Sequence, residues 1–324
     1  MSCTLVIPTR NDTTNLKRLL EQAFHMKCFA RAIVVDDASD SPLSPELCLL
    51  ERPDWVHLTR HENRKGAGAA RNLGLQFVET SHLLFFDSDD LLTPEIPHLL
   101  ADLDGREFDF CIFKHNDSRV SAAGSWGQTR WDEALWRHAG VAVGALRPVS
   151  PSSAPTLART ANYPWNKIYR TDFLRDNGLR CSETLVHNDI LLHWASFIRA
   201  RDILSSDRIA AIHHVGLKSG RLTDHSGPER LAVFNILRDV LNTEIPGDRN
   251  FFAAFLGFAS YLFGWIRGVI APSQQPALDA QIRQFLLAAL SPGDYRNLTV
   301  SDPVLALRIN LQLAETRRAG AGTS

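Results

Sequence analysis

The chain has 324 residues, of which 35 are Lys or Arg and 36 are Asp or Glu, so its formal net charge is −1. Hydrophobic residues make up 44% and charged residues 22%, which argues against global disorder, and the length predicts two domains at about 150 residues each. Proteins that bind duplex nucleic acid usually carry an excess of basic residues, and this chain carries none, so we expect no nucleic-acid partner.

Short apolar runs alternate with amphipathic segments through the first third of the chain. Runs bounded by Pro or polar residues are typical of buried strands, and apolar residues spaced three and four apart are typical of helices. The alternation predicts βαβ units, and therefore an α/β fold with a mostly parallel sheet and right-handed crossovers. The predicted strands are residues 4–8, 32–35, 55–58, 82–86 and 108–113, and the predicted helices are residues 16–23, 67–78 and 91–103.

The alternation stops after Lys114. A polar stretch at 118–127, an amphipathic segment rich in Trp at 130–138 and a Pro/Ser loop at 147–155 follow. From Arg230 onward the pattern is helical, with one break at Pro246-Gly247. We therefore expect a helical region at the C-terminal end.

Residues 251–266 contain no charged side chain. The stretch is shorter than the ~20 apolar residues that a membrane span needs. We expect a buried helix of a C-terminal bundle here. A peripheral contact with a membrane surface through residues 251–270 is the second interpretation, and a true span is the third.

The five cysteines are widely spaced and include no Cys-x-x-Cys pair. This pattern argues against a disulfide framework and against a cysteine zinc site, and it favours a reducing compartment. The first ten residues lack the basic and apolar regions of a signal peptide. We expect a cytoplasmic protein, either free or peripheral at the inner face of the cell membrane.

Polar residues follow three of the predicted strands, at 8–10, 36–37 and 87–90. Ligands of open parallel sheets bind beyond the carboxyl ends of the strands, so these residues predict a site. Asp87 and Asp89 can face one small volume, and two carboxylates that close together need a cation. A hard divalent ion, Mn²⁺ or Mg²⁺, fits such ligands. We expect Asp90 to cap the helix predicted at 91–103.

Residues 63–74 (NRKGAGAARNLG) are similar to a Gly-rich phosphate cradle. Arg71 stands where the dinucleotide fingerprint has Gly or Ala, and the Walker pattern is absent. Lys65 and Arg71 flank a predicted helix N-terminus, which makes an anion site physically reasonable.

Four motifs occur in order along the chain: Ile7–Asn11, Val34–Asp40, Asn63 with Gly68–Gly74, and Phe86–Asp90. Together they resemble family 2 glycosyltransferases of the GT-A fold, which are nucleotide-sugar-dependent inverting enzymes. The resemblance is strong over residues 3–115 and looser over 163–223. It implies a GT-A (Rossmann-like) domain at 1–225, with a nucleotide-sugar-binding half at 1–115 and an acceptor-binding half at 116–225, before a helical region at 226–324.

The resemblance implies a donor site at the ends of the first strands. Asp37 would accept a hydrogen bond from the uracil ring, which favours a UDP-sugar donor, and Arg71 would approach the ribose or diphosphate. Family members commonly have Tyr where Arg10 stands. The nucleotide-sugar-binding residues implied in this way are Pro8, Thr9, Arg10, Asp37, Lys65, Arg71, Asp87 and Ser88.

The resemblance further implies a metal motif at Asp87 and Asp89, with Asp89 as the direct ligand of Mn²⁺ or Mg²⁺. His214 is a candidate third ligand. His213-His214, with Lys218, Arg221 and Thr223, are similar to a late loop that closes over the diphosphate.

Residues 163–170 and 187–189 are similar to the acceptor-binding segment of the family. Trp165 would be the acceptor-binding aromatic residue, and Asp189 would be the general base. Asn188, also assigned to the acceptor, departs from the Glu that usually precedes this Asp. The alternative for Asp189 is an N-cap of a helix at 190–197.

We expect an inverting, metal-dependent glycosyltransferase. It would move a sugar from a nucleotide sugar to a hydroxyl of a glycan or lipid-linked acceptor in surface polysaccharide synthesis. One alternative is a nucleotidyltransferase, although the loop after the first strand lacks the Gly that such enzymes carry there. The other is a non-catalytic scaffold that docks on a membrane or partner through its C-terminal helices.

Overall fold

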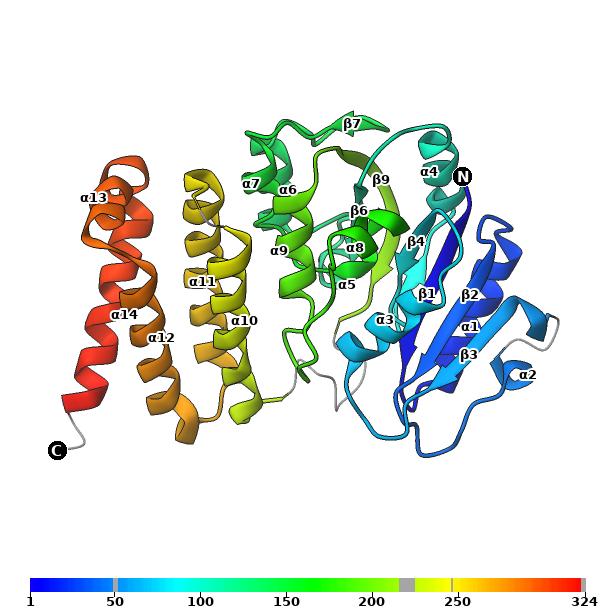
Figure 1. The fold of residues 1–324 in the computed structure, drawn as a ribbon, viewed down its shortest axis with the longest axis horizontal. Coiled ribbons are helices and arrows are strands. Elements are labelled where there is room, and N and C mark those ends of the chain that lie inside the picture. The colour runs from blue at the N-terminus through cyan, green and yellow to red at the C-terminus, as the bar shows by residue number, and fades with distance from the viewer. Residues whose placement is uncertain (49–51, 216–224, 246, 322–324) are drawn as a thin grey trace. The chain divides into compact units, whose positions relative to one another are not determined.

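The computed structural model describes residues 1–48, 52–215, 225–245 and 247–321, and Figure 1 shows the fold. Lys218, Arg221 and Thr223 of the expected late loop lie outside these residues. The chain divides into two compact units, residues 1–217 and 218–324, which we describe separately.

A mixed, mostly parallel sheet forms the centre of the first unit, in the order β3-β2-β1-β4-β8-β6-β9-β5, with β7 paired to β9. Parallel pairs join β1 to β2 and β4, β2 to β3, and β6 to β9. The carboxyl ends of these strands therefore meet at one edge of the sheet. The strands are β1 (Cys3–Thr9), β2 (Arg31–Asp36), β3 (Val56–Arg60), β4 (His82–Phe85), β5 (Leu91–Leu92), β6 (Phe110–Asp117), β7 (Arg147–Pro148), β8 (Lys167–Arg170) and β9 (Ile203–His213).

Helices cover both faces of this sheet. Leu5 and Ile7 of β1 point into a cluster that includes buried residues of α1 (Thr13–His25) and α4 (Glu95–Leu103). Successive strand residues point to opposite faces, so Val6 faces the other side, where it lies against Gly74 of α3 (Ala67–Gln76). The remaining helices of this unit are α2 (Pro45–Cys48), α5 (Ser118–Ala122), α6 (Arg130–His138), α7 (Ala154–Leu157), α8 (Thr171–Asp176) and α9 (Ile190–Arg199).

The five predicted strands are confirmed, but the predicted helix at 91–103 is wrong at its start. Leu91–Leu92 form β5, which pairs with β9, and the helix begins at Glu95. The side-chain amide of Gln22 accepts from the Leu92 N–H at 3.1 Å and donates to the Leu92 carbonyl at 2.9 Å. A side chain from α1 therefore fixes this segment as extended chain. Asp90 consequently does not cap α4.

Three strands, β7, β8 and β9, lie in the region after residue 114, where the sequence predicted no strand. β8 is four residues long and begins with the charged Lys167. β9 contains Ser205, Ser206 and Asp207, and its pairing with β6 shifts register at two places. A β-bulge breaks the period-two pattern on which strand prediction depends.

The second unit is helical, as expected. Phe234, Phe263 and Phe285 pack together from three helices, with ring centroids 5.3 to 6.4 Å apart. The helices are α10 (Val233–Asp239), α11 (Arg249–Val269), α12 (Gln275–Ala289), α13 (Pro292–Ser301) and α14 (Pro303–Ala321).

Among the described residues, α11 is the one helix long and apolar enough to cross a membrane by length and composition. Asp248 caps it through bonds from the N–H groups of Asn250 and Phe251. Phe255 and Phe263 are buried, whereas Tyr261 and Trp265 are each 44% exposed. A core helix of a soluble protein has the same composition, so α11 is weak evidence for a membrane span.

Candidate active site

The loops after β1 and β2 are tied to each other. The Asn11 side chain donates to Asp40 Oδ2 at 3.0 Å and accepts from the Asp40 N–H at 2.8 Å. Ser39 Oγ accepts from the Asn11 N–H at 2.9 Å. Arg10 is exposed, with its guanidinium 3.6 Å from an Asp40 oxygen, while Pro8 and Thr9 are buried at the strand end. Of these three, only Arg10 presents its side chain toward solvent.

Asp37 anchors the chain that leads into α3. Its carboxylate accepts hydrogen bonds from the backbone N–H groups of Lys65 and Gly66 and from His61 Nδ1, each at 2.8 Å. Burial raises the pKa of Asp37, but these three donors outweigh burial and hold the pKa below its ordinary value. The Lys65 side chain is exposed. Asp37 therefore shapes the loop, and about one of its four lone-pair positions remains for a ligand.

The Gly-rich segment makes close contact with protein backbone. A Cβ at Gly68 would overlap the Ser182 carbonyl oxygen and come within 2.8 Å of the Asn188 Cβ. Gly66, with φ of +92°, supplies the turn before α3. Asn72, one turn along, exchanges two hydrogen bonds of 2.9 and 3.0 Å with the backbone of Cys181. α3 therefore holds the segment that precedes α9.

Arg71 is buried at the centre of the site and contacts both halves of the domain. Its Nη2 donates to Asp87 Oδ1 at 2.5 Å, and its Nη1 donates to Asn188 Oδ1 at 2.9 Å. Burial lowers the pKa of Arg71, but the nearby charge of Asp87 raises it above the ordinary value. Arg71 therefore stays a cation that neutralises Asp87.

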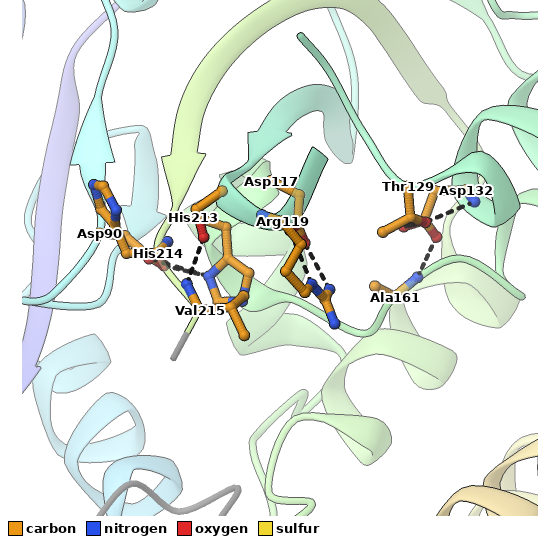
Figure 2. Close-up of polar contacts among 10 residues, drawn as sticks. Asp90, Asp117, Arg119, Thr129, Asp132, Ala161, His213, His214 and Val215 are labelled. Atoms are coloured by element: carbon orange, nitrogen blue, oxygen red, sulfur yellow. Dashed lines mark hydrogen bonds and ion pairs between the residues drawn. The ribbon is translucent and has the colours of Figure 1, made fainter. Parts of the chain in front are cut away.

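The loop after β4 alternates between exposed and buried side chains. Asp87, which is 30% exposed, and Asp89 are partly accessible, whereas Ser88 and Asp90 are buried. Ser88 Oγ donates to Asp12 Oδ2 at 3.1 Å. Asp90 accepts from His213 Nδ1 at 3.1 Å and from the His214 N–H at 2.9 Å, as Figure 2 shows. Asp90 therefore fastens the loop after β4 to the end of β9, and this is its role in place of the predicted helix cap.

The residues present fit a divalent ion that takes one or two ligands from the protein and the others from water and phosphate oxygens. Asp87 and Asp89 present two carboxylates at the sheet edge, and within the described ranges no three His, Cys, Asp or Glu side chains converge. Mg²⁺ and Mn²⁺ commonly bind one or two carboxylates and complete their shell with water and phosphate oxygens. His214 does not join Asp87 and Asp89 in a three-residue group.

Asp189 stands at the start of α9, where its side chain makes no cap hydrogen bond to the described helix. Burial raises its pKa to about 6, although the charges of Arg71 and Lys167 act in the opposite direction. His187, two residues earlier, has φ of +60°, a region that non-glycine residues rarely adopt and that is often found at functional sites. A carboxylate with a pKa near the working pH suits a general base.

Trp165 is 1% exposed, so its ring lies inside the domain in this structure. It stacks on Tyr163 with ring centroids 4.5 Å apart, and His213 and His115 also pack on this pair. Tyr163 and His213 are partly exposed, so Tyr163 is the member of the stacked pair that a ligand can reach.

Lys167, two residues after Trp165, is fully buried. Its ammonium group donates to the Tyr163 carbonyl at 2.6 Å and to Asn166 Oδ1 at 2.8 Å. Burial lowers its pKa to about 7.

Sequence reasoning missed a further group of buried polar side chains at this edge, also drawn in Figure 2. Asp117, at the end of β6, is fully buried and pairs with Arg119 Nη2 at 2.6 Å, and Asp132 accepts from the Ala161 N–H at 3.0 Å. The predicted strand ended at 113, four residues before its true end. Extending it would have placed Asp117 among the strand-end carboxylates.

Comparisons with known proteins agree with this geometry. Residues 4–150 match the family described as glycosyl transferase family 2. A pre-mycofactocin glycosyltransferase of Mycobacterium tuberculosis is 37% identical over 86 residues, which are 26% of this chain and 17% of that relative. The match therefore spans less than a fifth of the relative's length.

Solved structures share the fold. TarS residues 1–349 of S. aureus in complex with UDP-GlcNAc superpose with a TM-score of 0.73 at 18% identity, covering 98% of this chain and 90% of that one. The mannosyltransferase PcManGT of Pyrobaculum calidifontis, in complex with GDP-Man and Mn²⁺, gives a TM-score of 0.54 at 14% identity and covers 98% and 86%. The strand-end motifs, the family match and the shared fold together show that residues 4–150 match glycosyl transferase family 2 and that the chain adopts the GT-A fold.

Proposed function

We propose that the protein is an inverting glycosyltransferase that transfers a sugar from a UDP-sugar to a hydroxyl group of a glycan or lipid-linked acceptor, in surface polysaccharide synthesis. The observation that carries the proposal is the position of Asp189. This partly accessible carboxylate has a pKa of about 6, and Arg71 joins the residue before it to the strand-end carboxylate Asp87. The Arg71 guanidinium thus links the loop proposed to bind the sugar donor, through Asp87, to the residue that precedes the proton acceptor Asp189.

The residues supply the parts of a single displacement. Asp189 takes the proton of the acceptor hydroxyl as its oxygen bonds to the anomeric carbon, and the bond from that carbon to the diphosphate oxygen breaks. Attack opposite the leaving group inverts the anomeric centre. Asp87 and Asp89 would hold Mn²⁺ or Mg²⁺, which when bound neutralises negative charge on the diphosphate.

The donor half follows from the loops after β1 and β2. Arg10 is exposed beside Asp40, so its guanidinium can lie against a base, and Asp37 keeps an acceptor position at the strand end. TarS was solved with UDP-GlcNAc and with UDP, which supports a UDP-sugar as the first donor to test. PcManGT was solved with GDP-Man and Mn²⁺, so GDP-mannose is the matched comparison ligand.

On the acceptor side, we assign the sugar-contacting ring to Tyr163 rather than to Trp165, because Tyr163 is the accessible member of the stacked pair. The buried Trp165 ring then supports the Tyr163 ring by stacking against it. We also propose peripheral contact with the inner face of the cell membrane through residues 251–270, because Tyr261 and Trp265 of α11 are each 44% exposed.

Calorimetric titration tests the donor proposal. We expect UDP and UDP-GlcNAc to bind more tightly with Mn²⁺ present, and the chain to release UDP slowly from UDP-GlcNAc in the absence of an acceptor. Absence of binding by any nucleotide, with or without Mn²⁺, would indicate a scaffold. Pyrophosphate release from a nucleoside triphosphate and a sugar phosphate would indicate a nucleotidyltransferase.

A further inference from the structure

One buried guanidinium connects the loop that carries Asp87 with the segment that carries Asp189. Arg71 donates from Nη2 to Asp87 Oδ1 and from Nη1 to Asn188 Oδ1, at 2.5 and 2.9 Å. Asn188 is 6% exposed, and its carbonyl accepts from the Ser182 N–H at 2.8 Å. Asp189 follows directly in the chain. The two halves of the proposed reaction therefore meet at one side chain.

The surroundings leave this segment little freedom. Gly68 packs against Ser182 and Asn188 so closely that a methyl group would overlap them. Asn72 pairs with the backbone N–H and carbonyl of Cys181. These contacts hold the segment against α3 at Cys181, Ser182 and Asn188. The bond from Arg71 adds a polar link at Asn188, immediately before Asp189.

We propose that Arg71 and Asn188 are positioning residues that couple the donor-binding loop to Asp189. This inference rests on the proposed function. A guanidinium is planar and presents its donors in a fixed fork, so Arg71 fixes the Asp87 carboxylate and the Asn188 amide in one orientation relative to each other. Asp189 follows Asn188 directly in the chain, so its carboxylate is held in a set position relative to the loop that binds the donor.

The identity of Asn188 matters in this arrangement. A neutral amide accepts from Arg71 without cancelling its charge, so the cation continues to act on both Asp87 and Asp189. A carboxylate at position 188 would form a second ion pair with Arg71 and place another negative charge beside Asp189. Like charges that close favour protonation, so the pKa of Asp189 would rise.

Three variants of the full chain test this coupling. Asn188→Leu keeps the side-chain size but removes the acceptor for Arg71, Asn188→Asp keeps an acceptor oxygen and adds charge, and Asn72→Leu is the matched control. Asn72 holds the same segment through Cys181, and its side chain bonds to Cys181 and Glu183. The assays are the release of UDP from UDP-GlcNAc with Mn²⁺ across pH, the affinity for UDP by calorimetry, and thermal unfolding.

We expect Asn188→Leu to lower kcat by ~10- to 100-fold, the scale of a misplaced catalytic group, while the Kd for UDP changes less than about threefold. Asn188→Asp should recover kcat at high pH, with its acid limb displaced upward by the added charge. The charged and titratable groups that act on Asp189 are Arg71, Asp87, Lys167 and Cys181, and all remain in these variants. Asn72→Leu should lower the unfolding temperature and leave kcat within about threefold.

Equal losses of kcat in Asn188→Leu and Asn72→Leu would show that Asn188 only stabilises the segment, and would refute the coupling. A loss of UDP affinity as large as the loss of kcat would also refute it, because Asn188 would then hold the donor. If the unaltered chain binds no nucleotide sugar, the proposed function fails, and the coupling fails with it. Normal nucleotide binding with an unchanged kcat in Asn188→Leu overturns the coupling alone.

Discussion

Asp189, the carboxylate that we assign as general base, should lower the stability of the fold at neutral pH. Burial raises its pKa to about 6, against an ordinary value of 3.8. Between these two values the folded state holds a proton that the unfolded state has released, so stability falls as pH rises through this window. A pKa elevated by about 2 pH units corresponds to about 3 kcal/mol, at 1.36 kcal/mol per unit.

Asp189→Asn isolates this effect, because the amide has the shape of the protonated acid and does not ionise. We expect the variant to exceed the unaltered chain in free energy of unfolding by about 3 kcal/mol above pH 7. The difference should shrink as pH falls and disappear below about pH 4, where both side chains are neutral. Its kcat should fall by ~10²–10⁴-fold, the usual scale for loss of a general base.

Urea unfolding at pH 4, 5, 6 and 7.5, followed by tryptophan fluorescence, measures this difference. Six of the seven tryptophans lie in the first unit and Trp265 alone in the second, so the signal reports mainly on the domain that holds Asp189. Asp172→Asn, at an exposed carboxylate, is the control and should leave stability unchanged at each pH. A variant of Asp189 that is less stable than the unaltered chain at pH 7.5, or equally stable at every pH, would refute the reasoning.

Three further predictions concern the metal, the packing of α3 and the second unit. Asp89→Ala should abolish the Mn²⁺-dependent part of UDP binding and leave the urea midpoint unchanged, because the side chain lies on a strand-end loop; calorimetry with and without Mn²⁺ decides. Gly68→Ala should destabilise the domain by about 2 kcal/mol or more, because the added methyl group would overlap the Ser182 carbonyl. Gly264→Ala is the matched comparison: no described atom lies near its Cβ position, so it should stabilise α11 by roughly 0.5–1 kcal/mol. Phe255→Lys should destabilise the helical unit by about 2 kcal/mol or more by burying an unpaired charge, and an unchanged thermal unfolding profile would contradict the core position of Phe255.

The strands of the first half were predictable because each is a short apolar run that ends at polar residues. In a parallel sheet that pattern also marks the functional edge, so Asp37, Asp87 and Asp89 follow from the same observation as the fold. The later strands were not predictable from periodicity. β8 begins with a buried lysine, and β9 is bulged, so neither presents a regular apolar face.

Individual side chains were harder to place than strands. Asp90 had the sequence position of a helix cap, yet a pair formed with His213, distant in sequence, decides its role. Arg71 resembled an anion ligand beside a Gly-rich turn, but the close approach permitted by Gly68 buries it against Asn188. These contacts depend on tertiary packing, which local sequence patterns do not predict.

The cross-linked loops after β1 and β2 bear on how fast and how favourably a nucleoside can associate. Because Asn11 and Asp40 already hold each other through two hydrogen bonds, these loops are ordered during folding rather than when a ligand arrives. When a nucleoside binds at this end, the protein backbone loses little conformational entropy, and most of the entropy loss is that of the nucleoside itself. The end of the domain built by β1 and β2 thus acts as a rigid template for the nucleoside.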